Sequence, residues 1–219
     1  MKLLRDNGLT IVLVLATVAT IIGMVIAGHA VYSDELSQHG QVPVDFSAYL
    51  TSGHFLSALF ENWESEFLQM SAYVVLTAFL FQRGSAESKD PDEVSSQDTF
   101  PQDDTLNPHA PAPVRRGGTW AKVYAYSLGL ALFVLFLVSF LMHLRDSAAA
   151  QAKEAAMHGG VPPTVWEHFG SSEFWFESFQ NWQSEFLSTA VLVVLSIFLR
   201  FRGSPESKPV AAPNVKTGA

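Results

Sequence analysis

An uncharged apolar run from Leu9 to Ala27 limits what this chain can fold into more than any other feature. As a helix rising about 1.5 Å per residue, the run is long enough to cross a hydrocarbon core about 30 Å thick. Lys2 and Arg5 precede it, as basic residues precede a secretory signal peptide, but the run is longer than the usual apolar region of such a peptide. We therefore expect a retained helix that spans a membrane.

Three further apolar segments extend this expectation to four spans. Residues 67–81, 123–142 and 186–199 are apolar, and the chain is 48% hydrophobic with 16% charged residues, less charge than a soluble domain carries. The first and last of these segments are too short to cross the core alone, so their spans must begin upstream. The sequence predicts an all-α membrane protein with four transmembrane helices, at about residues 8–28, 60–82, 121–143 and 179–201.

The distribution of basic residues predicts the orientation. In the four-span arrangement eleven of the 13 Lys and Arg residues flank one side, and only Arg145 and Lys153 lie in the other two loops. Basic residues accumulate on the cytoplasmic side of membrane proteins. We therefore expect both termini and the central segment to be cytoplasmic, with the loops from His29 and His143 facing outward.

The central segment and the C-terminal tail lack the composition of a folded core. Residues 85–118 are rich in Pro, Asp and Ser and poor in large aliphatic residues. Such a segment cannot bury enough apolar surface to offset the entropy of folding. We predict a disordered cytoplasmic linker at 85–118, able to dock a cytoplasmic partner, and a cytoplasmic tail at 204–219.

The chain contains a tandem repeat. Shifted by about 119 residues, the segment from His39 to Lys89 matches a second segment without gaps. Each copy holds two spans, so the copies run in the same direction, as helical-hairpin repeats at residues 1–84 and 119–203. Asp45 and Thr164 precede the second span of each copy as N-caps, Thr164 with Glu167 at the capping-box spacing. They predict an outer amphipathic helix in each repeat, from about residues 46 and 165, with a bend in the first copy at 52–53.

A ten-residue motif is the best-matched part of the repeat. Phe60-ENWESEFL-Gln69 aligns with Phe179-QNWQSEFL-Ser188. Paired helical hairpins with an Asn-Trp-[Glu/Gln]-Ser-Glu-Phe signature resemble an uncharacterised family of small bacterial membrane proteins, catalogued as a domain of unknown function. The resemblance implies a protein of the bacterial inner membrane, and it implies no activity and no functional residues.

Within the motif, Glu66 and Glu185 form the first candidate site, together with Asn62 and Asn181. Other acids of the first copy become glutamine in the second, whereas these two positions stay acidic. Acidic side chains inside a membrane usually face the bundle interior and often serve function. Two near carboxylates would share a proton or hold a cation. The alternative is structural, with each Glu bonding its own Asn, a Trp indole or a backbone group.

The remaining motif residues suggest an interface. Trp63 and Trp182 suit the belt of aromatic residues at a membrane boundary. Ser65 and Ser184 accompany them at the same place in each copy. We interpret these four residues as motif positions at the outer boundary of the second and fourth spans.

Two histidines are equivalent in the repeat and give a weaker candidate. His39 and His158 lie in the outer loops and, with Glu66 and Glu185, would supply ligands for a divalent metal such as zinc, iron or manganese. No His-x-x-x-His or Glu-x-x-His spacing supports that site. The alternative is a pair of loop histidines beside a glycine turn.

Composition excludes several functions. The chain has no cysteine, so thiolate metal sites and cysteine nucleophiles are absent, and its net charge of -8 argues against nucleic acid as a partner. No nucleophile elbow, P-loop or dinucleotide fingerprint occurs. We predict a structural or accessory membrane protein that is not an enzyme and needs no cofactor. The alternatives are a proton- or cation-handling transporter or channel, and a metal-binding protein with an outward His/Glu site.

Overall fold

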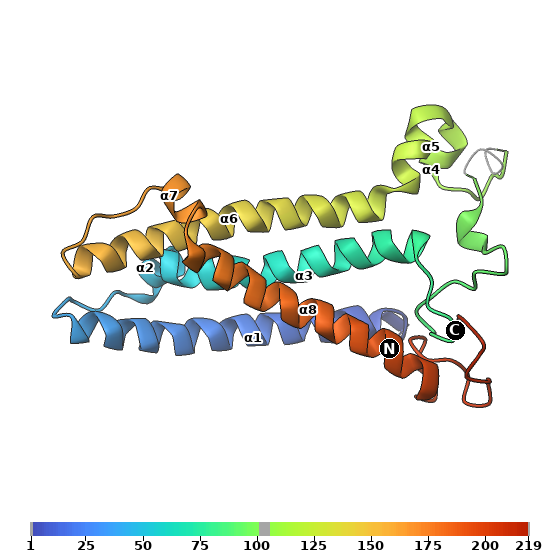
Figure 1. The fold of residues 1–219 in the computed structure, drawn as a ribbon, viewed down its shortest axis with the longest axis horizontal. Coiled ribbons are helices and arrows are strands. Elements are labelled where there is room, and N and C mark those ends of the chain that lie inside the picture. The colour runs from blue at the N-terminus through green and yellow to red at the C-terminus, as the bar shows by residue number, and fades with distance from the viewer. Residues whose placement is uncertain (1, 101–105, 219) are drawn as a thin grey trace. The chain divides into compact units, whose positions relative to one another are not determined.

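The computed structural model describes residues 2–100 and 106–218, and the described elements are all helical, with no strand among them (Figure 1). The chain divides into two compact units, each made from both repeats. The first unit contains residues 1–60 and 141–174, and the second contains residues 61–140 and 175–219. The all-α prediction is therefore confirmed.

The first unit is built from long helices and the short helices that precede them. It holds α1 and α2, the start of α3, the end of α6, α7 and the first residues of α8. The bounds are α1 Lys2–Gln38, α2 Phe46–Leu50, α3 Gly53–Phe79, α6 Ser127–Met157, α7 Val165–Phe169 and α8 Ser172–Phe198. Its core is a hydrophobic cluster made by Tyr32, Leu36, Tyr49 and Phe55.

The predicted N-caps form as expected. The Asp45 carboxylate accepts a hydrogen bond from the Ala48 backbone N–H at 2.7 Å, and this bond lowers the pKa of Asp45. Thr164 and Glu167 form a reciprocal capping box, in which each side chain accepts from the backbone N–H of the other residue. The starts at residues 46 and 165 are confirmed, and so is the break before Gly53.

Gly53 allows two helix backbones to approach closely. A Cβ atom placed on Gly53 would lie 2.6 Å from the Asp146 carbonyl oxygen and 2.7 Å from the Ala150 backbone nitrogen. These neighbours are backbone atoms of α6 and cannot rotate aside. The start of α3 is thus held against the end of α6 by a position that accepts no side chain.

The two long helices of this unit, α1 and α6, each end in a turn of the same type. The amides of Gly40 and Gln41 donate to carbonyl oxygens at the end of α1, and those of Gly159 and Gly160 do the same at α6. Gly40 has a φ of 70° and Gly159 a φ of 71°, in the left-handed region that favours glycine after a helix. A histidine therefore occupies the same place at each helix end, directly before the glycine.

The second unit contains most of α3 and α8 and the first part of α6. Three short helices accompany them: η1 Ser96–Asp98, α4 Ala112–Arg116 and α5 Gly118–Ala125. The segment after α3 contacts α8 through hydrogen bonds from Ser85 Oγ and the Ala86 backbone N–H to Ser196 Oγ, at 2.8 and 3.2 Å. Lys208 is buried and donates to carbonyl oxygens of Gly84 and of the C-terminal tail.

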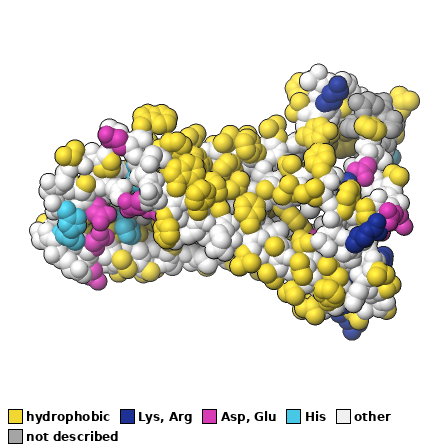
Figure 2. Space-filling model, in the orientation of Figure 1, with side chains coloured by type: hydrophobic (Ala, Val, Ile, Leu, Met, Phe, Trp, Pro, Cys, Tyr) yellow, Lys and Arg dark blue, Asp and Glu magenta, His cyan; other side chains and the backbone are white. Residues whose placement is uncertain are grey.

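Among the residues that the structure describes, two helices are long and apolar enough to cross a membrane, judged by length and composition. They are α1 and α6, and none of the apolar window of α1 is buried. Hydrophobic side chains cover much of the visible surface in Figure 2. Large exposed apolar surface on a folded protein commonly marks contact with a membrane or another protein.

Candidate functional site

The two copies of the Asn-Trp motif are joined by hydrogen bonds in the second unit. The Trp182 indole N–H donates to Glu64 Oε1 at 2.9 Å, and the Asn181 amide donates to the Glu61 carboxylate. Further along the same two helices, the Gln69 amide donates to the Thr189 hydroxyl. The motif residues of α8 therefore bond the motif residues of α3.

Glu64 is the most deeply buried member of this group. Its side chain has no exposed surface, and a buried carboxylate is costly unless it accepts hydrogen bonds. The Trp182 indole supplies one such bond. Glu64 is not among the site residues predicted from the sequence, because the equivalent residue of the second copy is Gln183. Its difference between the copies was the only signal in the sequence.

The repeated serines make local bonds. Ser65 Oγ donates to the Asn62 carbonyl oxygen and Ser184 Oγ to the Asn181 carbonyl oxygen, both at 2.8 Å. Ser65 is buried, whereas Ser184 is exposed. Both serines therefore bond a carbonyl oxygen three residues earlier in their own helix.

Glu66 and Glu185 lie close enough for their negative charges to interact. Glu66 is exposed and Glu185 is half-buried. Asn181, the residue four positions before Glu185, donates instead to Glu61 and to the Glu177 carbonyl oxygen. In the second copy, therefore, the amide of the motif is directed to the opposite repeat and to its own helix backbone.

Trp182 also belongs to an aromatic cluster. Its ring centroid lies 5.6 Å from that of Phe179 and 6.3 Å from those of Phe136 and Trp175. Trp63 on α3 is 39% exposed, so the two equivalent tryptophans have different surroundings. The position of either at a membrane boundary stays a prediction.

His39 and His158 come together in the first unit. Their ring centroids lie 5.0 Å apart with the rings nearly perpendicular, and both residues are exposed. His39 Nδ1 lies 2.9 Å from the Glu35 carbonyl oxygen. Among the residues that the structure describes, no group of three or more His, Cys, Asp or Glu side chains is arranged to hold a metal ion.

A second histidine site in this unit was not predicted. His168 is buried; its Nδ1 lies 2.8 Å from the Gln151 amide oxygen and its Nε2 2.8 Å from Ser147 Oγ. Because an amide oxygen only accepts, Nδ1 carries a proton and donates it to Gln151, while Nε2 shares a hydrogen bond with the Ser147 hydroxyl. Gln151 in turn donates to Glu173. This chain of bonds holds α7 against α6.

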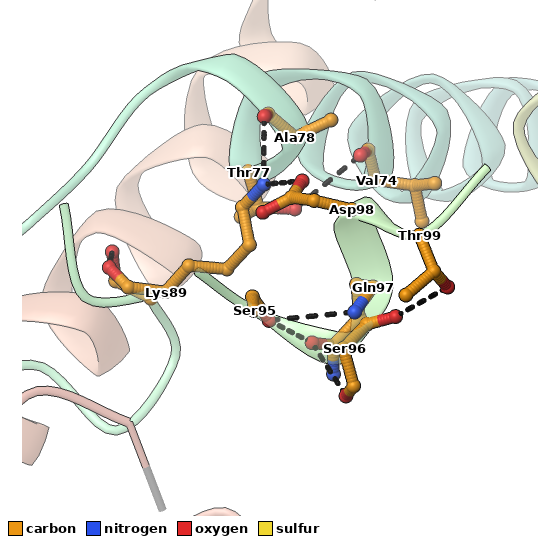
Figure 3. Close-up of polar contacts among 10 residues, drawn as sticks. Val74, Thr77, Ala78, Lys89, Ser95, Ser96, Gln97, Asp98 and Thr99 are labelled. Atoms are coloured by element: carbon orange, nitrogen blue, oxygen red, sulfur yellow. Dashed lines mark hydrogen bonds and ion pairs between the residues drawn. The ribbon is translucent and has the colours of Figure 1, made fainter. Parts of the chain in front are cut away.

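The second unit also contains a pocket of about 670 Å³ between the end of α3, the segment 86–98 and the tail. Figure 3 shows the Lys89 ammonium at its wall, donating to Asp98 at 2.6 Å and to the Ala78 carbonyl oxygen at 3.1 Å. Glu87 also lines the pocket, and burial raises the pKa of this carboxyl. The pocket occupies part of the segment for which a partner-docking role was predicted.

Comparison with known proteins places the chain in a family without giving it an activity. The family model described as a domain of unknown function, DUF6766, matches residues 1–219. No curated protein matches the chain, and no solved structure does.

Proposed function

The chain belongs to the family of the domain of unknown function DUF6766, and from its own residues we propose a structural or accessory role in the bacterial inner membrane, without enzymatic activity. The Asn-Trp motifs would fasten the two repeats to each other inside a bundle of four membrane spans. The bundle would present an outward surface formed by the loops and short helices. The observation that carries this proposal is the bonding of Trp182 to Glu64 and of Asn181 to Glu61.

Helix length supports four spans. α3 and α8 have 27 residues each, about 40 Å of helix at 1.5 Å per residue, and the membrane core is about 30 Å thick. α1 and α6 are long and also apolar enough to cross a membrane. The bias of basic residues supports cytoplasmic termini.

Cysteine labelling tests this topology, since the native chain offers no thiol. Gln38→Cys should react with a membrane-impermeant maleimide added from outside, and Phe100→Cys only after the membrane is opened. Labelling of Phe100→Cys in intact cells would refute the proposed orientation. Extraction of the protein by alkaline carbonate would refute the membrane assignment altogether.

A double-mutant cycle tests the fastening role of the motif. Trp182→Phe removes the indole donor, Glu64→Leu removes the buried acceptor, and the coupling is read from unfolding in detergent. Contacting residues in one network couple by about 0.5–3 kcal/mol. A coupling within about 0.3 kcal/mol of zero, the range expected for independent sites, would refute the proposal.

A second candidate function is proton or cation handling by Glu66 and Glu185. The proximity of their charges supports it, because two near carboxylates favour a shared proton or a bound cation. Proteoliposomes with an internal pH dye should show flux that Glu66→Gln/Glu185→Gln abolishes. Flux equal to that of empty liposomes, or unchanged in the double variant, would refute this candidate.

A further inference from the structure

The twin turns that end α1 and α6 carry two equivalent histidines. His39 directly precedes Gly40, and His158 directly precedes Gly159. Both histidines have a backbone N–H that bonds the carbonyl oxygen four residues earlier, at 3.2 Å in each case. The two matching segments therefore place one imidazole each at the same position of the same type of helix-ending turn.

The two imidazoles are within reach of a single ion. Their ring centroids are 5.0 Å apart. Zinc binds imidazole nitrogen at about 2.0–2.1 Å, so two imidazoles on one tetrahedral ion have their ligand nitrogens roughly 3–3.5 Å apart. A small rotation of two exposed side chains would bring the nitrogens into that range.

The contact of His39 with its own helix leaves one nitrogen of its ring available to bind a metal ion. Nδ1 donates to the Glu35 carbonyl oxygen, at 2.9 Å, which leaves Nε2 as the acceptor nitrogen of the neutral ring. Histidines that ligate metals usually donate their other ring N–H to a carbonyl or carboxylate in this way. Three charged residues of the same two helices, Glu35, Lys153 and Glu154, line a cavity of about 70 Å³ in this unit.

From this geometry we propose that His39 and His158 together bind one exchangeable divalent transition-metal ion, with Zn²⁺ as the reference case. No third His, Cys, Asp or Glu is arranged with them among the described residues. The other coordination positions would therefore be filled by water or by an external ligand. A two-histidine site of this kind is open and reversible, unlike the closed four-ligand sites that stabilise zinc-binding folds. The proposal is independent of the structural role proposed for the Asn-Trp motifs.

Metal titration of the whole protein is the test. The full chain, with any purification tag removed, is titrated with ZnCl₂ alone in a chelator-free calorimeter buffer at pH 7.5. We expect about one ion per chain, with weaker binding at lower pH because a metal ligand must be in its deprotonated form. His39→Ala and His158→Ala should each weaken binding at least about tenfold, since even residues that only support a ligand change affinity about 10–100-fold. His109→Ala, an exposed histidine of the linker, is the matched control and should bind as the parent does.

A ligand-exchange variant separates coordination from a structural effect. His158→Cys offers a thiolate in a chain without other thiols, so Co²⁺ should bind it with a new sulfur-to-cobalt charge-transfer band in the near ultraviolet. That band should disappear in His39→Ala/His158→Cys. Absence of saturable Zn²⁺ binding by the parent would overturn the proposal. So would parent-like Zn²⁺ affinity in His39→Ala/His158→Ala, or a His158→Cys cobalt spectrum that does not depend on His39.

Discussion

Replacement of Gly53 by alanine should destabilise the protein, although alanine is the better helix former. The added Cβ would lie 2.6 Å from the Asp146 carbonyl oxygen and 2.7 Å from the Ala150 backbone nitrogen. Ordinary van der Waals contact needs roughly 3.5 Å, so α3 would have to move away from α6 by nearly 1 Å. Overpacking of this kind costs about 1–3 kcal/mol, whereas Gly→Ala in a compatible helix gains only about 0.4–1 kcal/mol.

The net loss of about 1–2 kcal/mol should lower the unfolding temperature in detergent by about 2–8 °C. The assay is circular dichroism at 222 nm during heating, with parent and variant in the same detergent. Ser172, the equivalent residue of the second repeat, is exposed, so Ser172→Ala is the matched control and should change the midpoint little. An unchanged or raised midpoint for Gly53→Ala would refute the close approach of the two backbones.

Three further predictions concern groups outside the proposed spans. Burial lowers the pKa of His54, so the folded state resists its protonation, and the free energy of unfolding falls as the pH drops through about 6.5 and below. His54→Gln should therefore lose less unfolding temperature between pH 7 and pH 5 than the parent does. A loss as large as the parent's would contradict this prediction. Burial raises the pKa of Glu87, so ionisation of this carboxyl lowers the free energy of unfolding increasingly as the pH rises. Glu87→Gln should therefore raise the unfolding temperature more at pH 7 than at pH 4. Glu93 is exposed, and Glu93→Gln is the control. Lys208→Met removes the donor to three carbonyl oxygens, and an unsatisfied buried polar group costs about 1–3 kcal/mol. Cleavage of the tail by a protease that does not cut at lysine should become faster, and a tail as resistant as the parent's would show that these three bonds do not hold it.

Local signals were predictable from the sequence. Asp45 and Thr164 are N-caps because a short acceptor side chain precedes a helical segment, and this depends only on residues three positions away. Glu167 completes the second cap for the same reason. The break before Gly53 likewise follows from a small flexible pair between two helical stretches.

Contacts between distant segments were not predictable in the same way. Glu64 accepts the Trp182 indole N–H, and Ser147 bonds the buried His168, across more than a hundred residues in one case and about twenty in the other. Both depend on which face of one helix meets another, and helical spacing within one segment does not determine that. The comparison of the two copies favoured positions that stay the same, whereas Glu64 and His168 have different residues at their equivalents, Gln183 and Tyr49.

The bonds between the motifs also bear on how a duplicated chain diverges. Both donors, Asn181 and Trp182, belong to the second copy, and both acids belong to the first. In a chain made of two second copies, Asn181 and Trp182 would donate to the neutral amides of Gln180 and Gln183 instead of to carboxylates. These bonds would be weaker, because charge-assisted hydrogen bonds are roughly twice as strong as neutral ones. The two matching segments are therefore not interchangeable, because the donors lie in one segment and the acids in the other.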